Sequence, residues 1–134
     1  MMDFLFIFLF VLLAIFHAYE NYCLIKTRQE NNDSRPLNHY TESLKYIGGC
    51  ILFGLFAYYI SDWSVWCVLG FSVLTRMVFF DISLNLFRGL RISYENPNAK
   101  GSSIIDRIEQ VLPFWHRWCI YFAFYIILIF NTVS

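Results

Sequence analysis

The chain has 134 residues, of which 58% are hydrophobic and 21% aromatic, and its mean hydropathy is +0.51. A soluble domain of this size cannot bury so much apolar surface, which excludes an ordinary globular fold. Ten basic and ten acidic residues give a formal net charge of zero, so the chain lacks the basic surface that nucleic-acid binding requires. We therefore expect a membrane protein with lipid as a partner and no nucleic acid.

The first apolar run extends from about residue 4 to residue 25 and is long enough to cross a hydrocarbon layer of about 30 Å. A cleaved signal peptide would begin with basic residues, but the charge that precedes this run is Asp3. We therefore expect a retained transmembrane helix. Residues 26–43 that follow are polar and include Pro36, which predicts a loop.

The second and third apolar runs cover residues 44–60 and 63–87. The link between them is so short that the two helices should form an antiparallel hairpin. Small residues in the second run, Gly48, Gly49 and Gly54, let a neighbouring helix approach closely and favour oligomerisation. Trp63 and Trp66 lie at the start of the third run, where an interfacial aromatic belt is expected.

A second polar loop, residues 88–112, leads to the last apolar run at residues 114–133. Ser103 and Asp106 have the spacing of a helix cap, and apolar residues then recur on one side of a short helix that Pro113 ends. The predicted fold is an all-α bundle of four transmembrane helices, forming a single domain over residues 1–134. A short interfacial amphipathic helix precedes the last span.

The distribution of lysine and arginine predicts the orientation of the bundle. Both long polar loops and their flanks carry basic residues, whereas the hairpin link and both ends of the chain carry none. Because cytoplasmic loops are enriched in lysine and arginine, the two long loops should lie in the cytoplasm. Both termini are then expected to be extracytoplasmic.

Several polar side chains fall within the spans, toward the predicted cytoplasmic leaflet, where each charge costs about 2.5 kcal/mol or more. Spacings of three and four residues place most of them on shared faces of the first and third spans, while Arg76 points away from the face of Asp81. The predicted polar cluster consists of His17, Glu20, Asn21, Arg76, Asp81, Asn85, Arg88, His116 and Arg117.

The favoured interpretation is that these residues hold the helices together. Glu20 would then pair with Arg76, and each charge would be neutralised within the bundle or across a boundary between protomers. Asp81 would pair with Arg88 or Arg117. The competing interpretation is a hydrated pocket that opens to the cytoplasm and carries out chemistry.

An enzyme acting on a lipid or headgroup at the cytoplasmic leaflet would use His17, Glu20, Asp81 and Asn85 as its polar centre. The sequence contains neither an HExxH metal motif nor a GxSxG nucleophile elbow, so we predict no metal and no cofactor, and the patterns favour a non-enzymatic protein. A second alternative is a small channel or membrane-disrupting effector. Residues 4–16 offer nothing polar to an ion crossing a single protomer.

One pattern in the third span and the following loop supports a resemblance. It comprises Phe80-Asp81, Asn85, Arg88-Gly89, Gly101, Ser103 and Asp106-Arg107. This pattern resembles uncharacterised small membrane proteins from phage and Bacteroidota genomes. The resemblance implies a bacterial inner membrane and supplies no activity.

The leading hypothesis is a non-enzymatic integral membrane protein that acts as a homo-oligomer or as a subunit of a membrane complex. Its cytoplasmic loops would bind a partner or anionic headgroups. The basic residues of the second loop, Arg88, Arg91, Lys100 and Arg107, would each favour anionic lipid by about 1 kcal/mol.

Overall fold

The computed structural model of the chain describes residues 2–33, 39–94 and 111–133, with side chains placed throughout except at residues 39–42. These residues form four α-helices and no strand: α1 (Met2–Glu30), α2 (His39–Ser61), α3 (Val65–Phe87) and α5 (Phe114–Val133). Each helix contains a segment long and apolar enough to cross a membrane. This confirms the predicted all-α class and gives the chain the build of a small membrane protein.

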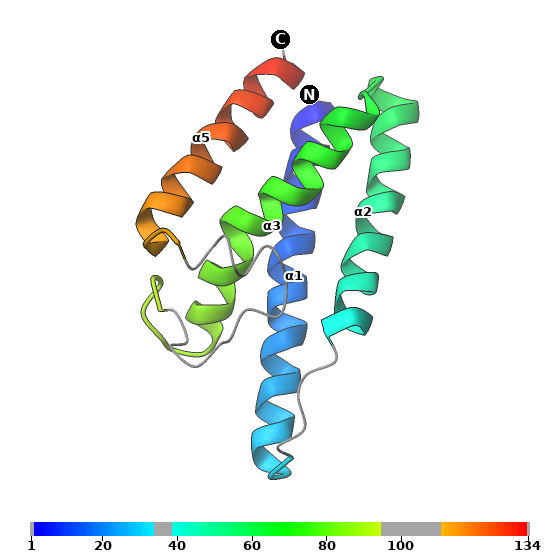
Figure 1. Cartoon of the computed structure of the whole chain (residues 1–134). Coiled ribbons are helices and arrows are strands. Elements are labelled where there is room, and N and C mark those ends of the chain that lie inside the picture. The colour runs from blue at the N-terminus through cyan, green and yellow to red at the C-terminus, as the bar shows by residue number, and fades with distance from the viewer. Residues whose placement is uncertain (1, 34–38, 95–110, 134) are drawn as a thin grey trace.

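The bundle is organised around α1 and α3, which share the most extensive contact (Figure 1). Helix α2 packs mainly against α1, and α5 packs mainly against α3. Both termini and the α2–α3 link lie at one end of the bundle in Figure 1, and the last turns of α1 project beyond the other helices at the opposite end. We call these the terminal end and the opposite end.

Two helices end in backbone turns that satisfy their last carbonyl groups. Asn32 has a φ of 51°, and the Asp33 amide donates to the Arg28 carbonyl at 3.0 Å. Gly89 has a φ of 66°, and the Leu90 amide donates to the Asn85 carbonyl at 2.9 Å. Both have the hydrogen-bond pattern of a Schellman motif, which ends a helix with one left-handed residue. Helix α1 therefore continues to Glu30, five residues beyond the predicted span.

An aromatic core fills the bundle near its terminal end. The Trp63 ring stacks on Phe71 at 4.8 Å between ring centres, and Phe10 stacks on both. The Trp63 indole nitrogen donates to the Asp3 carboxylate at 2.8 Å, which joins the start of α1 to the α2–α3 link. Trp63 is 3% exposed and Trp66 is 81% exposed, so Trp66 alone of this pair faces outward as an interfacial residue would.

The glycines of α2 bring neighbouring helices together within the chain. A Cβ atom added at Gly49 would lie 2.8 Å from the Leu13 side chain of α1, and one added at Gly54 would meet Val68 of α3. A Cβ atom at Gly48 would meet nothing within 4 Å. The predicted thin face of α2 is therefore divided, because Gly49 and Gly54 serve contacts inside the bundle.

The short interfacial helix is not supported by the structure. Its predicted cap, Ser103 and Asp106, lies outside the described residues, as does most of the helix itself. The part that is described, Val111 and Leu112, forms a turn and a bend. Helix α5 begins directly after Pro113.

We expect Gly54→Ala to destabilise the bundle and Gly48→Ala to leave it intact. Val68 is stiff about its Cα–Cβ bond, so it cannot easily move away from a new methyl group. The free energies of unfolding of the two variants should differ by about 1–3 kcal/mol. Unfolding by sodium dodecyl sulfate in mixed micelles, followed by circular dichroism, measures both. Equal stabilities would contradict the close α2–α3 contact.

Candidate functional site

Arg76 is a charged residue at the middle of α3, a helix that is long and apolar enough to cross a membrane. It lies eleven residues from each end of α3, which is roughly 16 Å along the helix axis. Its guanidinium carbon lies 4.6 Å from the centre of the Phe80 ring and 5.8 Å from the centre of the Tyr46 ring. A cation over an aromatic face gains about 2 kcal/mol when water is excluded. Two ring faces therefore offset part of the cost of this charge.

His17 of α1 contacts the same two rings. Its imidazole lies 5.0 Å from the Phe80 ring and 5.2 Å from the Tyr46 ring, centre to centre, and the residue is 3% exposed. Side chains from three helices thus meet around one cation. We call His17, Tyr46, Phe80 and Arg76 the Arg76 cage.

Tyr46 also fixes α2 against α3 through its hydroxyl group. This hydroxyl donates to the backbone carbonyl of Ser72 at 2.7 Å, one helical turn before Arg76. The Ser72 hydroxyl donates to the Val68 carbonyl within α3 at 2.8 Å. A tyrosine can supply both an apolar face and a hydrogen-bond donor. The Tyr46 ring is therefore held in position beside the guanidinium of Arg76.

Glu20 does not join Arg76, contrary to the predicted pairing. A Glu20 carboxylate oxygen lies 3.9 Å from the Lys45 ammonium of α2, and both side chains are partly exposed. An exposed pair of this kind contributes little, about 0–1 kcal/mol. Asn21 donates to the His17 carbonyl at 2.9 Å, which is a contact within α1. Among the described contacts, Glu20 therefore does not reach the Arg76 cage, and Asn21 reaches it only through the backbone of His17.

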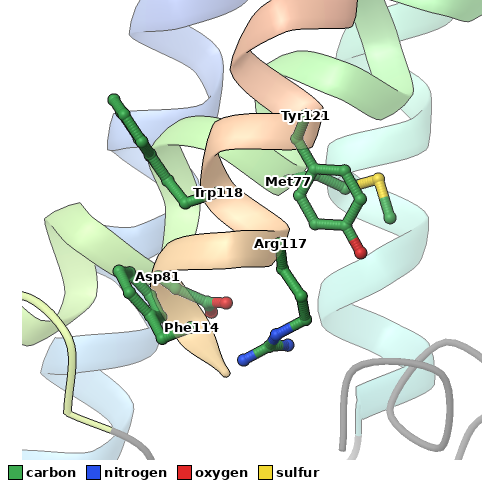
Figure 2. Close-up of a pocket in the computed structure, with 6 residues that line it drawn as sticks. All are labelled: Met77, Asp81, Phe114, Arg117, Trp118 and Tyr121. Atoms are coloured by element: carbon green, nitrogen blue, oxygen red, sulfur yellow. The ribbon is translucent and has the colours of Figure 1, made fainter. Parts of the chain in front are cut away.

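Asp81 and Arg117 line one pocket between α3 and α5 (Figure 2). The other lining residues are Met77, Phe114, Trp118 and Tyr121. Arg117 is buried, and Figure 2 shows its side chain and that of Asp81 coming from facing helices. The cavity volume is about 10 Å³, close to the minimum that one water molecule needs. This pocket has no room for a lipid headgroup.

The remaining predicted residues serve the end of α3 or face outward. The buried Asn85 amide donates to the carbonyl groups of Ile92 and Tyr94 at 2.9 and 3.0 Å. The Arg88 guanidinium lies 5.9 Å from the centre of the Tyr94 ring. These contacts hold the segment after α3 against the helix. His116 is exposed at the start of α5.

The predicted polar cluster is therefore divided among separate places. His17 and Arg76 meet in the cage, Glu20 meets Lys45, and Asp81 shares a pocket with Arg117. Within the described ranges, no three His, Cys, Asp or Glu side chains come together as a metal site would require. The sequence analysis did not identify the aromatic rings of the cage, because it considered polar side chains as the partners of Arg76. Phe80 follows Arg76 by four residues, a spacing that already places both on one helix face.

Comparisons of the chain with protein-family models, curated proteins and solved structures find no match. The site is therefore interpreted from its own geometry. The Arg76 cage presents a fixed cation within an apolar layer, and such a group is suited to binding an anion. The described contacts place no nucleophile beside a base at this position.

Changes at Tyr46 separate the two contributions of its side chain. Tyr46→Phe removes the hydrogen bond to Ser72 and should lower the free energy of unfolding by about 1 kcal/mol. Tyr46→Leu also removes the ring face beside Arg76 and should cost about 1–2 kcal/mol more. Detergent unfolding monitored by circular dichroism gives both values. Tyr59→Leu, at a highly exposed tyrosine of the same helix, is the control. Equal losses for Tyr46→Phe and Tyr46→Leu would contradict the cation–ring contact.

Proposed function

We propose that the chain is a non-enzymatic integral membrane subunit or oligomer whose opposite end binds anionic headgroups in the cytoplasmic leaflet. The observation that carries this proposal is the separation of charge along the bundle. Residues 1–25, 46–75 and 118–134 contain no lysine or arginine. These stretches include both ends of the chain and the whole α2–α3 link, where Asp3 and Asp62 are the charged residues.

The basic side chains gather where the helices meet the other surface. Lys26 and Arg28 lie in the last two turns of α1, and Arg88 and Arg91 follow the end of α3. The positive-inside rule assigns this end to the cytoplasm, with both termini extracytoplasmic. Each basic residue near an anionic surface favours binding by about 1 kcal/mol. A short interfacial helix that ends before the turn at Val111 would add Arg107 to this surface and belongs to the proposal.

The side-chain geometry gives less support to the alternatives. Glu20 lies beside Lys45 of α2, whereas Asp81 lines the pocket between α3 and α5, so the two carboxylates do not form one catalytic centre. A conducting path through a single protomer would have to pass the aromatic core at the terminal end, where Phe10 and Phe71 are completely buried. A membrane subunit that binds headgroups requires neither a catalytic centre nor a path for ions.

Replacing basic residues at the opposite end, which we also call the basic end, should weaken the preference of the protein for anionic lipid. The double variant Lys26→Gln, Arg91→Gln removes two exposed positive charges and should reduce selectivity for phosphatidylglycerol over phosphatidylcholine by about 2 kcal/mol. Spin-labelled lipids in contact with the reconstituted protein report this selectivity. The preference of the wild-type protein for anionic lipid should decrease in 1 M salt, because salt at this concentration screens interactions between charges over about 3 Å.

Asp62→Asn is the matched control, because it removes a charge at the terminal end and should leave the selectivity unchanged. If the wild-type protein shows no preference between the two lipids, or the double variant retains the full preference, headgroup binding by the basic end is refuted.

A further inference from the structure

Helix α3 presents an apolar stripe to the outside of the bundle. Trp66, Leu69 and Val73 are exposed by 81%, 49% and 52%. They are followed by the half-buried Arg76, so that successive members are three, four and three residues apart. Alternation of three and four is the spacing at which one helix packs into another along a seam. We call Trp66, Leu69, Val73 and Arg76 the α3 stripe.

Among the side chains that the structure describes, aromatic rings and not a carboxylate contact the charge of this stripe. In the described residues, the guanidinium of Arg76 contacts the rings of Phe80 and Tyr46. Glu20, a carboxylate of neighbouring α1, is held by Lys45. Asp81 lies five residues further along α3, roughly 140° around the helix, and lines the pocket against α5. A cation at this depth calls for an anionic partner.

We propose that the α3 stripe binds a transmembrane helix of a partner protein that carries an aspartate or glutamate near the middle of the bilayer. The carboxylate pairs with Arg76, and the apolar residues of the partner pack on Trp66, Leu69 and Val73. Glu20 lies beside Lys45 of α2 and Asp81 lines the pocket against α5, so neither carboxylate belongs to the α3 stripe, and the partner that we propose is a different protein and not a second copy. This contact is separate from headgroup binding at the basic end.

Depth favours a helix carboxylate over a lipid phosphate. Arg76 lies roughly 16 Å from both ends of α3, which is about half of the 30 Å hydrocarbon thickness. Phosphate groups lie at the surface of this layer, whereas a side chain of a spanning helix can be placed at its centre.

The cage prepares Arg76 for this contact. The Tyr46 ring, fixed by its hydrogen bond to the Ser72 carbonyl, and the Phe80 ring restrict where the guanidinium can lie. A guanidinium held in one place can donate two parallel hydrogen bonds to a carboxylate. Little side-chain freedom then remains to be lost when the partner binds.

The test uses two synthetic transmembrane peptides of about 20 leucines, one with a central aspartate and one without. Each peptide is reconstituted with the full-length protein in neutral phosphatidylcholine, and energy transfer between labels measures association. The aspartate peptide should associate roughly five- to thirty-fold more strongly, as found for polar contacts between model helices. Arg76→Leu should remove this difference, and Arg91→Leu should retain it.

Arg76→Gln provides a second variant of similar length without charge, and circular dichroism confirms that each variant remains helical. Equal association of both peptides with the wild-type protein would overturn the proposal, as would an aspartate preference that survives in Arg76→Leu and Arg76→Gln. Displacement of the aspartate peptide by added phosphatidylglycerol would identify a lipid phosphate as the occupant and would also overturn it. Because the first measurement uses neutral lipid, its failure leaves headgroup binding untouched.

Discussion

A charge inside a hydrocarbon layer must be compensated by the protein. Arg76, at the middle of α3, is such a charge if the helix crosses a membrane. The rings of Tyr46 and Phe80 compensate this charge in part, and the Tyr46 ring reaches the guanidinium because its hydroxyl is bound to the Ser72 carbonyl. The same two rings contact His17. The half-buried Arg76 and the two rings beside it therefore link the packing of α1, α2 and α3.

The two ends of the bundle are stabilised in different ways. Near the terminal end, stacked rings around Trp63 fill the space between helices, and a single hydrogen bond to Asp3 joins the chain start to the hairpin. Toward the opposite end, the contacts of Glu20 with Lys45 and of the Asn85 amide with two carbonyl groups lie near a second group of rings. This group consists of Tyr19, Tyr22 and Phe87. These polar contacts lie toward the end for which we propose headgroup binding.

The helices could be predicted from the sequence because a membrane requires long apolar segments. Their ends were less certain: the polar residues Lys26 and Arg28 suggested a loop, yet both are good helix formers and α1 continues until Asn32 turns the backbone. Partners were not predictable, since the contact of Glu20 with Lys45 depends on how α2 lies against α1, which spacing along one chain does not determine.

The direction in which the chain crosses the membrane tests the account most directly. In a variant without native cysteines, Asp62→Cys would mark the terminal end and Glu30→Cys the opposite end. A thiol reagent that cannot cross membranes is applied to intact cells. The account predicts that the cysteine at position 62 reacts at once and that the cysteine at position 30 reacts only after the membrane is opened. The reverse pattern would contradict the assignment of the basic end to the cytoplasm, and with it the proposed headgroup binding there.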